Sequence, residues 1–230
     1  MSASVLVIMQ GRLNSSRLPG KGLFTFFGQT IWERMCDIGS AIGPSVEVVF
    51  ATGDRPENYI AKEFIEAKGV RFYAGSEDNV LERFASVSQQ SSANYIVRVT
   101  CDNYLIQPAV ISGLISLVSN EDADYGYVEP LSHFAGEVIR RELLVEEFIS
   151  GKYSEMAREH VTFDIRSNRK YKLVTLPSDY LGIDHHQSIT LDSLEDLIRL
   201  RKIERRYPGC SRVSCIESVK SIQAEASSIN

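Results

Sequence analysis

The sequence lacks long hydrophobic runs and closely spaced cysteines, and each absence argues against a class of protein. No segment approaches the roughly 18 to 20 apolar residues of a membrane-spanning helix. The first apolar run, residues 5–9, is too short for the core of a secretory signal and has no basic flank before it. The cysteines, which are Cys36, Cys101, Cys210 and Cys215, include no CxxC pair and have no histidine at metal-ligand spacing. We therefore expect a cytoplasmic protein, in a reducing compartment and without a membrane segment.

Excess positive charge is also missing. The net charge is −5 and the pI is near 5.5, which leaves too little basic surface for a broad nucleic-acid footprint. Against this acidic background, Arg12, Arg17 and Lys21 gather in one short glycine-rich stretch. A local charge opposite to the global charge indicates a functional site.

Apolar runs of strand length alternate with helical patterns through the first half of the chain. Strands are predicted over residues 5–9, 46–51, 70–73 and 95–100, and helices over 31–38, 60–67, 80–87 and 108–118. This alternation predicts an α/β fold with a doubly wound, mostly parallel sheet of the Rossmann-like kind. The length suits a single domain, residues 1–230, with a substantial core.

The order is looser after about Asp124. Here the patterns predict strands over 125–130, 137–139, 171–176 and 188–191, and helices over 141–149, 156–161 and 194–203. We interpret residues 125–150 as a smaller subregion that carries acceptor specificity.

Residues 10–21, Gln10-Gly-Arg-Leu-Asn-Ser-Ser-Arg-Leu-Pro-Gly-Lys21, follow the first predicted strand. In an open parallel sheet this position is the usual phosphate cradle, because ligands bind beyond the carboxyl ends of the strands. Glycines let backbone N–H groups approach an anion, and the Arg and Lys side chains supply positive charge. The stretch fits neither the Walker-type loop nor GxGxxG. An ordinary solvated surface loop is the alternative.

The same loop closely resembles the N-terminal signature of the cytidylyltransferase family, which includes CMP-Kdo synthetases, CMP-sialate synthetases and spore-coat-polysaccharide-type cytidylyltransferases. Three later segments are similar to family segments in the same order: Gly75-Ser-Glu-Asp-Asn-Val-Leu-Glu-Arg83, Arg158-Glu-His-Val-Thr162, and Thr190-Leu-Asp192 with Asp196-Leu197. The resemblance implies a nucleotide-diphospho-sugar transferase-like fold and a Mg²⁺-dependent transfer of CMP from CTP to a small anionic acceptor, an acidic sugar or a phosphonate. It also implies a homodimer formed through residues 125–150.

The resemblance further suggests roles for individual residues. Arg17 and Lys21 serve the triphosphate, and the remaining nucleotide-binding candidates are Gln10, Gly11, Arg12, Ser16, Gly75, Ser76, Asn79 and Arg83. The candidate acceptor-binding residues are Arg98, Glu137, Arg158, Glu159, His160 and His186. Arg98 is an unusual cation within a predicted strand, where it either pairs with a carboxylate or lines the acceptor pocket. For His160 the alternative is a packed histidine.

Asp102 directly follows the strand predicted over 95–100, so its carboxylate is expected at the crevice that the phosphate loop faces. Mg²⁺ prefers carboxylate and phosphate oxygens, and the family binds metal through the aspartate of a Gly-Asp-x-Pro motif. Here the motif reads Cys101-Asp102-Asn103-Tyr104, which keeps the aspartate and changes its neighbours. The alternative for Asp102 is a turn or cap residue before Pro108.

Asp192 is the second candidate metal ligand, and the resemblance implies a metal or acceptor-orienting role for it. It ends a predicted strand and has Glu195 three residues later, a pattern that is also typical of a capping box. If both aspartates bind metal, we expect them about 4 to 7 Å apart.

The predicted reaction is direct in-line attack of an acceptor oxygen on the α-phosphorus of CTP, with pyrophosphate leaving. No Ser-His-Asp or Cys-His arrangement supports covalent catalysis. Two other functions stay open: a glycosyltransferase of related fold that uses a nucleotide sugar, and a non-catalytic nucleotide-binding protein. The cluster of Arg17 and Lys21 favours a triphosphate, since a nucleotide-sugar diphosphate requires less positive charge.

Overall fold

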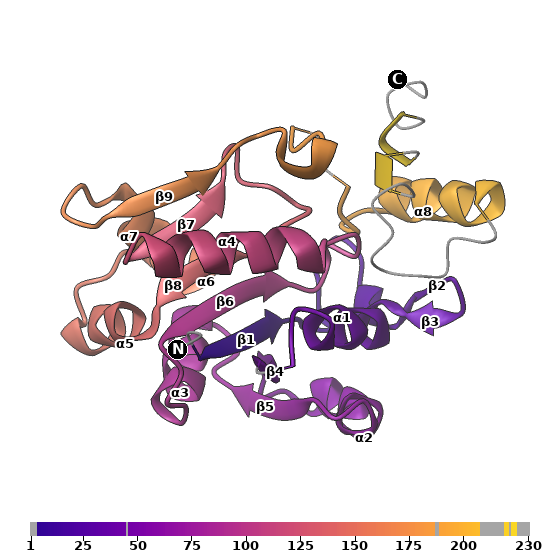
Figure 1. The fold of residues 1–230 in the computed structure, drawn as a ribbon. Coiled ribbons are helices and arrows are strands. Elements are labelled where there is room, and N and C mark those ends of the chain that lie inside the picture. Colours follow the sequence, from indigo (N-terminus) through magenta and orange to yellow (C-terminus); the bar gives the residue numbers. More distant parts are fainter. Residues whose placement is uncertain (1–3, 45, 187–188, 208–218, 221, 225–230) are drawn as a thin grey trace.

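The computed structural model describes residues 4–44, 46–186, 189–207, 219–220 and 222–224 (Figure 1). Ser188, Cys210 and Cys215 lie outside the described residues. The main strands are β1 (Val5–Gln10), β4 (Val46–Gly53), β5 (Arg71–Gly75), β6 (Tyr95–Thr100), β7 (Tyr125–Val128), β8 (Glu137–Arg140) and β9 (Leu173–Leu176). They form one sheet with the order β5-β4-β1-β6-β8-β7-β9.

Within this sheet, neighbouring strands are parallel except at β8, which pairs antiparallel with both β6 and β7. The predicted mostly parallel sheet is confirmed. Residues 125–150 supply β7, β8 and a helix that follows them, so this region is built into the main sheet. A separate small hairpin consists of β2 (Thr25–Phe26) and β3 (Gln29–Thr30).

The helices cover both faces of the sheet (Figure 1). They are α1 (Ile31–Ser40), α2 (Lys62–Ala67), α3 (Val80–Gln89), α4 (Pro108–Asn120), α5 (Arg141–Ser150), α6 (Glu155–His160), α7 (Phe163–Ser167) and α8 (Leu194–Arg206), with short 3-10 helices η1 (Lys21–Leu23), η2 (Pro56–Ala61) and η3 (Tyr180–Gly182). Along β1, Val7 and Met9 pack into the core with α1 and α4, whereas Leu6 and Ile8 pack into a second core with α3. Burial on both faces explains why β1 is a continuous apolar run.

Two predicted helices differ from the structure at one end, and one predicted strand is not found among the described residues. The helix expected over 156–161 ends at His160, because Val161 has a positive φ of 40° that an α-helix does not continue. The helix expected over 60–67 begins as the 3-10 helix η2 and becomes α-helical only in α2. Residues 189–191 form no strand; instead the Leu191 N–H donates to the carbonyl of Asp102 at 3.1 Å.

No helix in the described ranges is long and apolar enough to cross a membrane.

Candidate active site

The loop after β1 has a well-braced backbone. Leu13 and Leu18 are buried and anchor it to the core. The Gly20 N–H donates to the Leu13 carbonyl at 2.7 Å, and Gly20 has a positive φ of 72°, which glycine adopts without strain. At Gly22 the backbone lies so close to the Trp32 ring that an added Cβ would be 2.1 Å from it. Leucines and glycines thus hold the backbone, and the Arg and Lys side chains are left to face the crevice.

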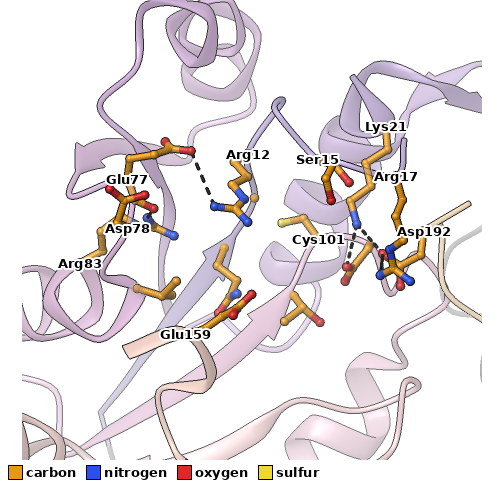
Figure 2. A pocket seen from close by; sticks show the side chains of 16 residues that line it. Arg12, Ser15, Arg17, Lys21, Glu77, Asp78, Arg83, Cys101, Glu159 and Asp192 are labelled. Atoms are coloured by element: carbon orange, nitrogen blue, oxygen red, sulfur yellow. Dashed lines mark hydrogen bonds and ion pairs between the residues drawn. The ribbon is translucent and has the colours of Figure 1, made fainter. Parts of the chain in front are cut away.

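A cavity of about 440 Å³ opens beside this loop at the carboxyl ends of β1 and β6 (Figure 2). Its lining brings together many predicted residues, namely Gln10, Gly11, Arg12, Ser16, Arg17, Lys21, Arg83, Asp102, Glu159 and Asp192. In Figure 2, Arg17, Lys21 and Asp192 lie at one end, and Glu77 and Arg83 lie at the other. The two ends therefore offer different chemistry to one elongated ligand.

A second cavity, of about 350 Å³, adjoins the first. Its lining includes three predicted acceptor residues, Arg98, Glu137 and His160, together with His133 and Arg166, which the motifs did not indicate. His160 is exposed, so it is not a packed core histidine. Asp102, Asp192 and Thr100 line both cavities. The two aspartates thus lie where the cavities meet.

Lys21 bridges the two aspartates. Its Nζ atom is 2.9 Å from Oδ2 of Asp102 and 2.8 Å from Oδ1 of Asp192. The separation of those oxygens cannot exceed the sum of the two distances, so the two aspartates are not farther apart than the upper limit of about 7 Å expected for metal-binding aspartates. Arg17 adds a second cation, 3.3 Å from Asp192. Sequence motifs pointed to each of these residues, but not to the contact between them.

Both members of the Lys21–Asp192 pair are charged at neutral pH. Burial by itself lowers the pKa of Lys21, but Asp102 and Asp192 outweigh this effect and raise that pKa above its ordinary 10.5. Burial raises the pKa of Asp192, and Lys21 and Arg17 more than reverse the effect, so this pKa lies below its ordinary 3.8. Lys21 and Asp192 are therefore fixed charges rather than a titrating acid and base.

The predicted capping box at α8 lies one residue later than expected. The Ser193 hydroxyl accepts from the Asp196 N–H, and the Asp196 carboxylate accepts from the Ser193 N–H. The pairing of Asp192 with Glu195 was therefore wrong, because Asp192 precedes the cap. Its carboxylate is left to face the cavities.

Glu77 is a cavity residue that the motifs did not single out. Its buried carboxylate accepts from Nδ2 of Asn14 at 2.7 Å and from Nδ2 of Asn58 at 3.4 Å, and it lies 3.7 Å from Arg12. Asn58 in turn accepts from the Leu13 N–H at 2.9 Å. Glu77 thus ties the loop after β1 to the segment after β5. Its place inside the matched segment 75–83 was the available signal.

Arg98 and Glu137 connect the walls of the two cavities. Their positions are opposite each other on β6 and β8, and the guanidinium donates to the carboxylate, so the predicted pairing of Arg98 with a carboxylate is confirmed. Glu137 also accepts from the hydroxyls of Tyr125 and Thr162. Burial raises the pKa of Glu137, but Arg98 and these hydroxyls lower it below its ordinary 4.5. Arg98 Nε donates to Oε1 of Gln10 at 3.1 Å, which extends the network into the first cavity.

Some predicted residues line neither cavity: Gly75, Ser76, Asn79, Arg158 and His186. The Asn79 side chain caps α3 by accepting from the Glu82 N–H at 3.1 Å. Arg158 pairs with Glu155 on its own helix, 3.2 Å away, and His186 is exposed. The structure therefore places these five beside the site or away from it.

A family model described as cytidylyltransferase matches residues 6–202, most of the chain. The chain belongs to the cytidylyltransferase family. Membership in this family implies a nucleotidyltransferase enzyme.

Individual proteins similar to this chain include one sequence relative and two solved structures. Spore coat polysaccharide biosynthesis protein SpsF of Bacillus subtilis is 27% identical over 222 residues, which cover 94% of this chain and 92% of that protein. A cytidylyltransferase structure from Leptospira borgpetersenii has a TM-score of 0.83 at 21% identity and covers 98% of this chain and 96% of its own. A CMP:2-keto-3-deoxy-manno-octonic acid synthetase complexed with CTP has a TM-score of 0.68 at 15% identity, with coverages of 89% and 99%. The two structural likenesses show the shared fold.

The departures from the cytidylyltransferase motif around Asp102 are accommodated by packing. Cys101 is buried, and burial raises the pKa of its thiol well above the ordinary 9.0, so it stays protonated and is not a nucleophile. Tyr104 is fully buried and packs edge-on against Phe26, with ring centroids 5.0 Å apart. These contacts leave Asp102 at the edge of the sheet, in both cavities.

The donor set at the crevice fits a divalent cation that a nucleotide helps to hold. Over the described part of the chain, no cluster of three or more His, Cys, Asp or Glu residues could hold a metal by itself. Mg²⁺ commonly keeps several waters and is bound by one or two carboxylates together with substrate phosphates. Asp102 and Asp192, beside a cavity rich in Arg and Lys, supply that number of carboxylates.

Proposed function

We propose that the protein transfers CMP from CTP to a small anionic acceptor, an acidic sugar or a phosphonate, and releases pyrophosphate. One observation carries the proposal: two adjacent cavities share Asp102 and Asp192. The cavity with the loop cations suits CTP, and the other suits the acceptor. The α-phosphorus would then lie where the cavities meet, within reach of both substrates.

In this reaction an acceptor oxygen attacks the α-phosphorus, the bond from that phosphorus to the bridging oxygen of the β-phosphate breaks, and the acceptor proton passes to solvent. Asp102 and Asp192 would hold Mg²⁺, which neutralises charge on the triphosphate and on the pentavalent phosphorus. Lys21 and Arg17 would bind phosphate oxygens and stabilise the leaving pyrophosphate. The protein thus acts by positioning and by fixed charge.

The ribose and base of CTP would occupy the opposite end of the first cavity, beside Glu77. Arg12 lies between the two ends (Figure 2), where it can reach the sugar or a phosphate. Arg83 braces this end by donating to the carbonyls of Ser76 and Glu77. We assign Ser76 and its neighbours Gly75 and Asn79 to the support of the nucleotide end rather than to direct contact.

The acceptor would bind in the second cavity. Arg166 lies 4.0 Å from Glu137 and is partly exposed, so its guanidinium has donors left for a carboxylate or phosphonate. Arg98 is held in place by Glu137 and lines the same cavity. His160, at the end of α6, adds a further polar contact. This grouping of cations supports an anionic acceptor.

Pyrophosphate release from CTP and Mg²⁺, measured over a panel of acidic sugars and phosphonates, tests the proposal. We expect release that depends on at least one acceptor and stops when the metal is chelated. A glycosyltransferase would instead free a nucleotide from a nucleotide sugar without pyrophosphate, and a non-catalytic protein would bind CTP without turnover. No release with any acceptor in the panel would contradict the proposed function.

A further inference from the structure

At the end of the first cavity nearest Asp102, the protein's own side chains balance one another in charge. Lys21 contacts Asp102 and Asp192 at 2.9 and 2.8 Å, and Arg17 contacts Asp192 at 3.3 Å. Two carboxylates and two cations cancel in formal charge. Figure 2 shows the Lys21 side chain beside Arg17 and Asp192, with the ion pairs drawn as dashed lines. The ammonium thus occupies the carboxylate pair that we assign to the metal.

This balance makes the carboxylate pair a poor site for a free divalent cation. An incoming ion has to share the carboxylates with the ammonium or displace it, and the Lys21 side chain is only 17% exposed. Water screens charges poorly at such a site, so repulsion between the ion and the ammonium is strong. Displacement also requires a new partner for the ammonium, because a partly buried charge left unpaired is costly.

A nucleoside triphosphate provides that partner. Lys21 lines the same cavity as Arg12 and Ser16, which we assign to the nucleotide. Charge-assisted hydrogen bonds to phosphate oxygens can replace those to the carboxylates. Two hydrogen bonds hold the Lys21 backbone: the Lys21 N–H donates to the Leu18 carbonyl, and the Phe24 N–H donates to the Lys21 carbonyl. The exchange therefore requires rotation of the Lys21 side chain and no movement of its backbone. A four-carbon stem with three donors suits such a move.

We propose that Lys21 is an exchangeable cation that occupies the aspartate pair until a metal–triphosphate complex arrives, so that Asp102 and Asp192 accept a divalent ion together with the nucleotide and not as the free ion. This inference rests on the proposed function for the identity of the nucleotide. Lys21 is then a positioning residue for the metal as well as a phosphate ligand.

Binding of Mn²⁺, followed by the electron paramagnetic resonance signal of the free ion, tests the proposal without turnover. The probe is Mn²⁺ alone, added to the wild type and to Lys21→Met and Lys21→Gln. Removing the ammonium should tighten binding of Mn²⁺ alone by about tenfold or more, because the carboxylates lose their competing cation. The matched control is Lys68→Met, which removes an ammonium 2.9 Å from Asp37 outside both cavities and should leave Mn²⁺ binding unchanged.

The same titration is repeated with CTP and no acceptor. Adding CTP should strengthen Mn²⁺ binding by the wild type more than by Lys21→Gln, since the variant has no bridge to release. Unchanged or weaker binding of Mn²⁺ alone by whichever Lys21 variant folds, as judged by circular dichroism, would overturn the proposal. Tighter binding of Mn²⁺ alone would support the exchange even if no acceptor released pyrophosphate, so failure of the proposed function is told apart from failure of this inference.

Discussion

Lys21, Asp102 and Asp192 are separated by long stretches of sequence, and motifs indicated each one on its own. Their contact depends on the crossover connections of the sheet and on the turn that places Asp192 ahead of the cap of α8. Residue types and spacing could predict the chemistry of these groups. They could not predict that an ammonium would bridge the two carboxylates, because that depends on distances set by the whole fold.

Glu77 is a second residue whose contacts could not be predicted from residue types and spacing. Nothing in its local pattern distinguishes it from the neighbouring Asp78, but it is the buried carboxylate that accepts from Asn14 and Asn58. Both partners come from other segments of the chain. A motif can mark the segment in which such a residue lies, and only packing selects the residue.

Gly53→Ala tests the role of Glu77 in holding the loop after β1. A Cβ at Gly53 would lie 1.6 Å from Oε2 of Glu77, so the carboxylate must move and weaken its contacts with Asn14 and Asn58. We expect a loss of about 1 to 3 kcal/mol in the free energy of unfolding, measured by urea denaturation, and weaker CTP binding by calorimetry.

The matched control is Gly43→Ala, where the nearest atom to the added Cβ is a methyl group of Val46 at 3.7 Å. It should change neither property appreciably. Equal stability and CTP affinity in Gly53→Ala and the wild type would show that Glu77 is not held as described.

Among the secondary-structure elements, the strands buried on both faces were the most predictable. β1 is a nearly continuous apolar run and β6 is apolar apart from Arg98 and Thr100, because helices cover both sides of the sheet. The wrong predictions fall where the backbone departs from regular periodicity. Val161 ends α6 with a positive φ, and the Leu191 backbone N–H donates to the Asp102 carbonyl rather than to a neighbouring strand. Hydrophobic periodicity carries no information on such contacts.

The antiparallel strand β8 is the element that places Glu137 opposite Arg98. Since the folded-state pKa of Glu137 lies below its ordinary 4.5, the unfolded chain binds the proton more readily. The stability that Glu137 contributes is therefore present above about pH 4.5 and is lost as the pH falls through the lowered pKa.

Glu137→Gln should remove the contribution of Glu137 to the dependence of the free energy of unfolding on pH at acid pH. It should also lower the free energy of unfolding at neutral pH by about 3 kcal/mol, because it leaves the Arg98 guanidinium without its counter-charge. Urea denaturation from acid to neutral pH measures both effects. Glu146→Gln, at an exposed position on α5, is the control and should keep the wild-type slope. An unchanged slope in Glu137→Gln would contradict the assigned direction of the pKa.

At the scale of the whole molecule, the doubly wound topology brings the phosphate loop after β1 and Asp102 after β6 to one edge of the sheet, since these parallel strands are neighbours. The alternation of strands and helices in the sequence predicted that the phosphate loop and Asp102 would lie at the same edge. The sequence patterns did not predict that this edge is divided into two cavities, because the division depends on β7, β8 and the segment that leads to α8.

The homodimer stays a prediction, and sedimentation velocity tests it. If residues 125–150 form the interface, Ile149→Glu should shift the protein towards monomer, because it puts a charge on an apolar side chain that is 67% exposed in the single chain. Ile198→Glu, at an exposed position on α8, should leave the dimer intact. A monomeric wild type at micromolar concentration would contradict the prediction.

The central claim is nucleotidyl transfer at the junction of the two cavities, and CTP labelled at the α-phosphorus tests it most directly. With Mg²⁺ and an acceptor from the panel that supports pyrophosphate release, the label should appear in a CMP–acceptor conjugate. Asp102→Asn should reduce this transfer by about a hundredfold or more, while Asp37→Asn, which changes an aspartate outside both cavities, should retain it. Full transfer by Asp102→Asn, or label that appears only as free CMP, would contradict the account.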